Sequence, residues 1–142
     1  MRAGWVRAAA VAALLQGLAH GALFLMARPT HGPDEAMVVA VMRDHVFNFS
    51  GAHRSYWQMY FGYGLLAAGV CFVEAALLWL IAPLARTDAP RLGLVVSLLI
   101  IANAAHAAII ALFFFYPPLV ADAVVALLLG LAIRPGRAKP VD

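Results

Sequence analysis

The stretch SYWQMYFGYGLLAAGVCFVEAALLWLIAP, residues 55–83, decides the fold: it is a long apolar run with one carboxylate, Glu74, near its middle. About 20 apolar residues are enough to cross the hydrocarbon core of a bilayer, so this run is typical of a membrane-spanning helix. A charged side chain inside such a helix costs roughly 3 kcal/mol unless it is paired, protonated or hydrated. We therefore expect Glu74 to have polar partners on other segments.

The composition agrees with a membrane protein. Of the 142 residues, 65% are hydrophobic and 12% are charged, whereas soluble domains carry about 25% charged residues. The net charge of +3 comes from basic residues at the ends of the apolar segments, so we expect a lipid bilayer and no nucleic acid as partner. The single cysteine, Cys71, excludes an internal disulfide.

Four apolar segments predict an all-α bundle of four transmembrane helices in a single domain, residues 1–142. We place the helices at about residues 6–26, 57–83, 92–116 and 117–134. The first segment could instead be a signal peptide that is partly processed, with Arg2 and Arg7 in its charged region. The length of the apolar run and the Gly17-x-x-x-Gly21 pattern favour a membrane anchor, because small residues let membrane helices approach closely.

The long polar connection, residues 27–55, contains a predicted amphipathic helix at about residues 34–47. Asp34 and Glu35 follow Pro33 in its first turn, where negative charge suits the helix dipole. Its apolar residues recur at helical spacing, so we expect it to lie on the membrane surface or to cap the bundle.

The basic residues predict the orientation. Seven of them fall on one side of the membrane, Arg2, Arg7, Arg86, Arg91, Arg134, Arg137 and Lys139, and three on the other, Arg28, Arg43 and Arg54. Because positive charge concentrates on the cytoplasmic side, both termini are expected in the cytoplasm. We predict a multi-pass integral protein of the cell (inner) membrane.

Each apolar segment carries polar side chains, which are costly inside a membrane and often functional. Counted at about 1.5 Å per residue from the outer surface, their order of depth is Asp122, His20, His106, Gln16, Asn103 and Glu74. If their faces meet, they form a polar pocket that opens outward and has Glu74 at its floor. We predict that Glu74 and His106 form an acid/base pair there, and that His20, Tyr63, Asn103 and Asp122 bind a small lipophilic ligand.

Two alternatives stay open at this point. The polar groups can serve only as hydrogen bonds between helices, with the protein a non-catalytic subunit or assembly factor of a larger membrane complex, or a homo-oligomer. A second alternative is a b-type haem held by His20 and His106; otherwise we predict no cofactor. No ligand spacing typical of zinc motifs occurs, so we predict no metal. The sequence leaves open whether the protein is an enzyme.

The segment from Gly51 to Gly64, GAHRSYWQMYFGYG, resembles the opening of the second helix in a group of small, uncharacterised bacterial four-helix membrane proteins. The four-segment layout is also similar to that of DoxX-like and emopamil-binding-like proteins. The emopamil-binding-like proteins are associated with sterol isomerisation and lipid-ligand binding, which implies a lipophilic ligand. The resemblance assigns no role to an individual residue.

Overall fold

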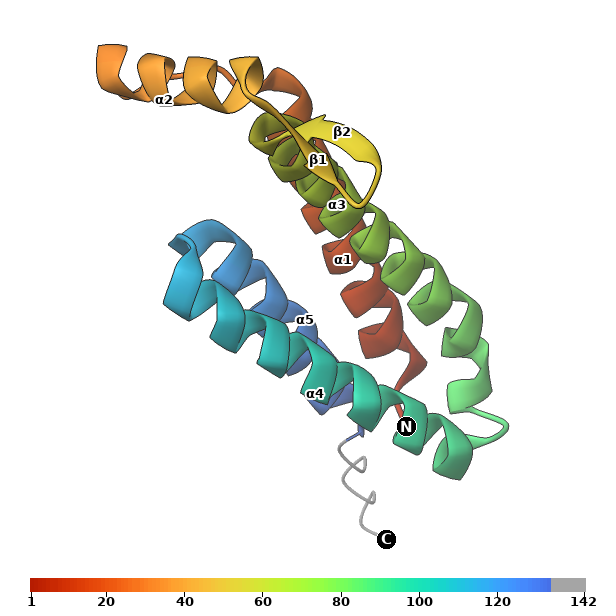
Figure 1. Cartoon of the computed structure of the whole chain (residues 1–142). Coiled ribbons are helices and arrows are strands. Elements are labelled where there is room, and N and C mark those ends of the chain that lie inside the picture. The colour runs from red at the N-terminus through yellow and green to blue at the C-terminus, as the bar shows by residue number, and fades with distance from the viewer. Residues whose placement is uncertain (134–142) are drawn as a thin grey trace, which may run out of the picture. The chain divides into compact units, whose positions relative to one another are not determined.

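The computed structural model describes residues 1–133, and four long helices dominate them (Figure 1). They are α1 (Ala3–Met26), α3 (Tyr56–Ile81), α4 (Ala89–Phe113) and α5 (Tyr116–Ile133). A 3₁₀ turn, η1 (Ala82–Ala85), continues α3, so that the apolar span Tyr56–Ala85 reaches 30 residues. All four spans in the described part are long and apolar enough to cross a membrane. The prediction of an all-α, four-helix membrane bundle is confirmed.

The helix boundaries differ from the predicted ones by up to three residues. Helix α4 begins at Ala89 and not near residue 92, because Pro90 fits the first turn, where no backbone N–H is needed. It ends at Phe113 because Phe114 is extended. Tyr116 begins α5, with two prolines in its first turn.

Three of the basic residues that favour the predicted orientation lie outside the residues that the structure describes: Arg134, Arg137 and Lys139.

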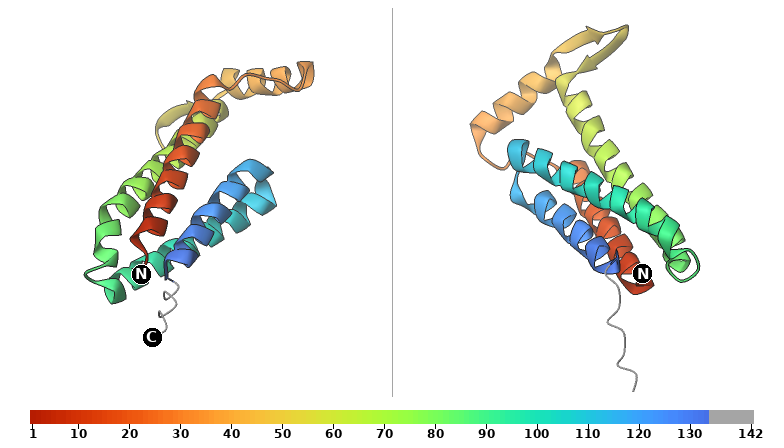
Figure 2. Two further views of the ribbon diagram at one scale, coloured as in Figure 1. Left: turned by 180° about the vertical axis from the view of Figure 1, so that it is seen from behind. Right: turned by 90° about the horizontal axis from the view of Figure 1, so that it is seen from below.

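The described chain forms two compact units. The first contains Met1–Gln16 and the described residues from Cys71 onward, and the second contains Gly17–Val70. Helices α1 and α3 each contribute one part to each unit. In the first unit α4 and α5 form an antiparallel helical hairpin (Figures 1 and 2).

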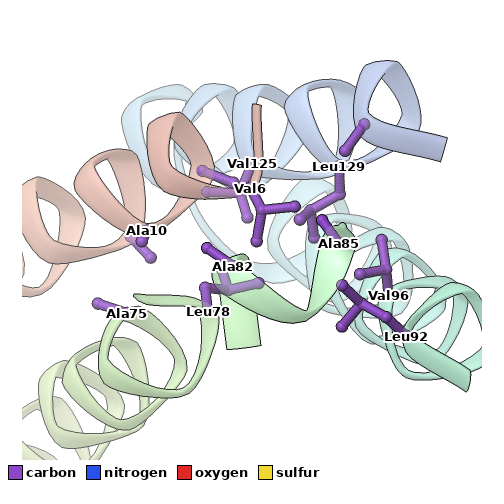
Figure 3. Close-up of a cluster of buried hydrophobic side chains, with 13 residues drawn as sticks. Val6, Ala10, Ala75, Leu78, Ala82, Ala85, Leu92, Val96, Val125 and Leu129 are labelled. Atoms are coloured by element: carbon purple, nitrogen blue, oxygen red, sulfur yellow. The ribbon is translucent and has the colours of Figure 1, made fainter. Parts of the chain in front are cut away.

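A core of small and branched apolar side chains fills one end of the first unit. Val6, Leu78, Val96, Val125 and Leu129 are fully buried there, together with several alanines from α1, α3 and η1 (Figure 3). The many alanines allow the helices to approach closely, as is usual for membrane helices. Within residues 1–133, no polar side chain belongs to this core.

Four arginines mark the same end of the first unit, which we call the basic end. The backbone N–H of Arg2 donates to Ala132 O at 3.0 Å, so the start of α1 and the end of α5 are neighbours. Arg7 places its guanidinium 5.6 Å from the Trp79 ring centroid. Arg86 and Arg91 flank the turn between η1 and α4. Aromatic and basic residues of this kind are typical of a membrane boundary.

In the second unit α1 and α3 pack closely at glycines. A Cβ atom at Gly21 would lie 3.6 Å from Ala68 Cβ, an ordinary contact, whereas a Cβ atom at Gly64 would overlap the ring of Phe24. The ring of Phe24 also stacks against Tyr60, with centroids 5.3 Å apart. The close approach at Gly21 agrees with the packing role predicted for this glycine.

The connection between α1 and α3 holds a short helix and a β-hairpin. Helix α2 (Pro33–Asp44) ends earlier than the predicted residue 47, because the next residues form strand β1 (Val46–Phe49). Strand β1 pairs antiparallel with β2 (Ala52–Ser55). Ser50 and Gly51 both have positive φ in the two-residue turn between them, the combination that suits a tight hairpin.

Ser55 links this hairpin to α3. Its hydroxyl accepts the backbone N–H of Gln58 at 3.2 Å, and the Gln58 side-chain oxygen accepts the backbone N–H of Ser55 at 2.9 Å. This reciprocal pair is a capping box, which satisfies two backbone donors at the start of a helix. It explains why α3 begins at Tyr56.

Candidate intramembrane polar site

Asp122 lies at the centre of the polar groups of the first unit. The residue is only 2% exposed, although it sits on an apolar helix. Its Oδ1 accepts a hydrogen bond from Gln16 Nε2 at 2.6 Å, which joins α5 to α1. A buried carboxylate needs such partners, because burial without them is costly.

The second oxygen of Asp122 approaches His106 on α4. His106 Nδ1 lies 2.8 Å from Oδ2, within ion-pair distance. The two groups are not aligned as a hydrogen bond, so Oδ2 has no hydrogen-bond donor among the residues that the structure describes. A turn of the His106 ring would align Nδ1–H with Oδ2 at this distance. The His106 side chain is 52% exposed and therefore has room to turn.

Asn103 and Glu74 form a second polar pair, between α4 and α3. Asn103 Nδ2 donates to Glu74 Oε1 at 2.6 Å and to the backbone oxygen of Leu99 at 2.9 Å. Asn103 is buried and Glu74 is half-buried. Glu74 therefore has the polar partner that its place in an apolar helix requires.

These five side chains occupy one level of the first unit, which we call the polar layer: Gln16, Glu74, Asn103, His106 and Asp122. Counted along their helices, Gln16 lies about 15 Å from Val6, and Asp122 lies about 15 Å from Ala132. The polar layer therefore follows directly on the apolar core of the basic end. Every transmembrane helix contributes at least one side chain to it.

One expectation about depth is wrong. The residue count predicts Asp122 nearest the outer surface and Gln16 about one and a half helical turns deeper, yet the two are hydrogen-bonded. The depth count assumed that all helices start at one height. Helix α5 has only 18 residues, so its first turn need not begin at the height at which the longer spans begin.

The structure brings together four of the six predicted site residues, Glu74, Asn103, His106 and Asp122. The other two, His20 and Tyr63, belong to the second unit. His20 stacks on Phe24 with ring centroids 5.0 Å apart, and Tyr63 is 72% exposed on α3. Gln16 joins these residues although it was not among the predicted site residues, and the signal that could have found it is its polarity within an apolar helix.

The carboxylate that contacts His106 differs from the predicted one. His106 approaches Asp122, while Glu74 contacts Asn103. The acid/base pairing of Glu74 with His106 stays a prediction. Within residues 1–133, no group of three or more His, Cys, Asp or Glu side chains is arranged to hold a metal ion.

The fold and these contacts define the class of protein: a multi-pass membrane protein of four helices with a polar layer between apolar segments. No protein-family model matches the chain, and no curated protein or solved structure matches it either. The polar layer is therefore the feature of the molecule from which a function can be inferred.

Proposed function

We propose that this protein binds a small lipophilic molecule at the polar layer, and that His106 presents a ring nitrogen to it. The observation that carries the proposal is the 2.8 Å approach of the buried Asp122 carboxylate to Nδ1 of the half-exposed His106. A polar side chain whose only task is to hold helices together has no need of exposure. His106 instead has one nitrogen facing its buried partner, while its side chain as a whole is 52% exposed.

A carboxylate next to one imidazole nitrogen selects the proton position on the ring. Asp122 favours a proton on Nδ1, which leaves a lone pair on Nε2. In this state Nε2 can accept a hydrogen bond or a proton from a bound molecule, and Asp122 stabilises the imidazolium that results. Asp122 then acts as a positioning residue. Glu74, held by Asn103, is the second acid/base group of the site.

The packing of the first unit closes one direction of access to the polar layer. The apolar core closes the basic end, because its branched side chains are fully buried. A ligand would therefore enter from the lipid or from the opposite end. With the termini in the cytoplasm, as the arginines at the basic end favour, that opposite end faces outward.

The competing function is that of a non-catalytic subunit or assembly factor. In that case the hydrogen bonds of Gln16 and Asn103 join helices, and a partner helix covers His106. The two functions differ in what a change at His106 does: loss of a ligand in the first, loss of a partner or of folded protein in the second. The haem alternative is tested separately, because a bis-histidine haem at His20 and His106 would give purified protein a Soret band.

The test is the ligand content of the protein purified in a mild detergent. We expect organic extraction and mass spectrometry to reveal a lipophilic compound that is retained by the wild type and lost from His106→Gln. His45→Gln, which changes an exposed histidine of the connection between α1 and α3, is the matched control and should keep the compound. Size-exclusion profiles and thermal melting verify that all three proteins are folded. Identical extracts from three folded proteins would refute the proposal.

A further inference from the structure

We infer that the molecule bound at the polar layer is a lipophilic cation with a hydrogen-bond donor, such as a protonated amine on an apolar body. This inference rests on the proposed function and adds the chemical class of the ligand. It follows from two properties of the first unit: how its hydrogen-bond donors are used, and what charge its interior carries.

The amide donors of the polar layer are largely occupied by protein acceptors. Asn103 Nδ2 has two hydrogens, and both are used, for Glu74 Oε1 and for the oxygen of Leu99. Gln16 Nε2 gives one of its two hydrogens to Asp122 Oδ1. The Asn103 amide therefore has no further donor to offer, and the Gln16 amide has one.

The Asp122–His106 pair, in contrast, has an acceptor left over. Asp122 Oδ2 is buried and receives no hydrogen bond from any residue in the described part of the chain. If the His106 ring turns so that Nδ1–H donates to Oδ2, Oδ2 is satisfied and the unused acceptor is then Nε2 of the same ring. A buried acceptor without a donor costs about 1–3 kcal/mol. A ligand that supplies donors recovers this energy, and a ligand that offers only acceptors does not.

The charges of the first unit point in the same direction. Up to residue 133, all lysines and arginines of the first unit lie at the basic end. The helical parts beyond the basic end carry the carboxylates Glu74 and Asp122 and no lysine or arginine. His106 can neutralise one carboxylate when it is protonated. When these carboxylates are ionised, they attract a cation strongly, because little solvent screens charge in a medium of low dielectric.

The experiment compares three probes that share a naphthalene body: 2-naphthylmethylammonium, 2-naphthylmethanol and 2-naphthoate. The full-length protein is placed in nanodiscs of zwitterionic phosphatidylcholine, and binding is measured by equilibrium dialysis with empty nanodiscs subtracted. We expect the ammonium probe to bind at least about tenfold more tightly than the alcohol, as a desolvated charge pair allows, and the naphthoate not to bind above background.

Two variants separate the charge of the polar layer from charge elsewhere. Glu74→Gln keeps the acceptor for Asn103 and should remove most of the preference for the ammonium probe. Glu35→Gln removes a carboxylate of the same type from the exposed helix α2 and should leave the preference unchanged.

The outcomes distinguish this inference from the proposed function. Equal binding of the ammonium and the alcohol, or a preference that survives Glu74→Gln, would overturn the cation inference and leave the binding site standing. Binding of none of the probes above background would overturn the inference together with the binding site, provided that mass spectrometry also finds no retained compound.

Discussion

Replacing Asp122 separates a hydrogen-bonding role from a role of its charge. In Asp122→Asn the side-chain oxygen can still accept the Gln16 hydrogen bond, and the cost of burying a carboxylate is removed. We therefore expect the free energy of unfolding to change by less than about 1 kcal/mol. In Asp122→Ala the acceptor is lost, so the Gln16 amide stays buried without its partner.

The expected cost of Asp122→Ala follows from the contacts. Hydrogen bonds between membrane helices contribute on average about 0.6 kcal/mol and at most about 1.7 kcal/mol. The unsatisfied amide and the small void add to this value, so we expect Asp122→Ala to lose roughly 2 kcal/mol. Val124→Ala, a change at a partly exposed position of the same helix, is the control and should cost less than about 0.5 kcal/mol.

The assay is reversible unfolding in mixed detergent micelles, in which increasing sodium dodecyl sulfate is followed by circular dichroism. We expect Asp122→Asn to have nearly the same free energy of unfolding as the wild type, and Asp122→Ala to have a clearly lower one. If Asp122→Asn were as unstable as Asp122→Ala, the charge of Asp122 would be needed for folding. The reasoning that assigns it to ligand binding through His106 would then be refuted.

Three further changes test the local structure. Gly64→Ala should destabilise the protein by about 1–3 kcal/mol, because the added Cβ would overlap the Phe24 ring. The control Gly62→Ala adds a Cβ that meets no atom within 4 Å, so it should be neutral or stabilising by up to about 1 kcal/mol. Equal melting temperatures of the two variants would contradict the close packing of α1 on α3 at Gly64. Ser55→Ala removes a capping-box hydroxyl and should cost about 1 kcal/mol, with unchanged stability in chemical denaturation as the contrary result. The backbone N–H groups before α2, foremost that of residue 31, hold the pKa of the Glu35 carboxyl below its usual range. This contact therefore stabilises the first turn of α2 at pH values above the unfolded pKa of Glu35, and it is lost as the pH falls through the lower folded pKa. Amide NMR should show this loss in the wild type, and the same pH dependence in Glu35→Gln would exclude Glu35 as its source.

The transmembrane layout was predictable from sequence because hydropathy and length decide it. In a bilayer every backbone polar group must be satisfied within the segment, so a run such as residues 56–81 has few alternatives to a helix. The boundaries were less predictable, since prolines are accepted in the first turns of α4 and α5. The β-hairpin was missed because Val46–Phe49 and Ala52–Ser55 are only four residues each.

The polar site was predictable only as a set of residues. Glu74, Asn103, His106 and Asp122 stand out because polar groups are costly in apolar helices. Their pairing depends on the relative heights of the helices, which a residue count does not give. For that reason the contact of Gln16 with Asp122 could not be foreseen.

The central claim is that Asp122 holds His106 with Nε2 available to a ligand. Nitrogen-15 solid-state NMR of histidine-labelled protein in lipid bilayers tests this claim most directly, with His106→Gln used to assign the signal. The account predicts a neutral His106 ring protonated on Nδ1, a shift of its Nε2 resonance when 2-naphthylmethylammonium is added, and loss of the Nδ1 preference in Asp122→Asn. A ring protonated on Nε2, or a His106 signal that neither Asp122→Asn nor the probe changes, would contradict it.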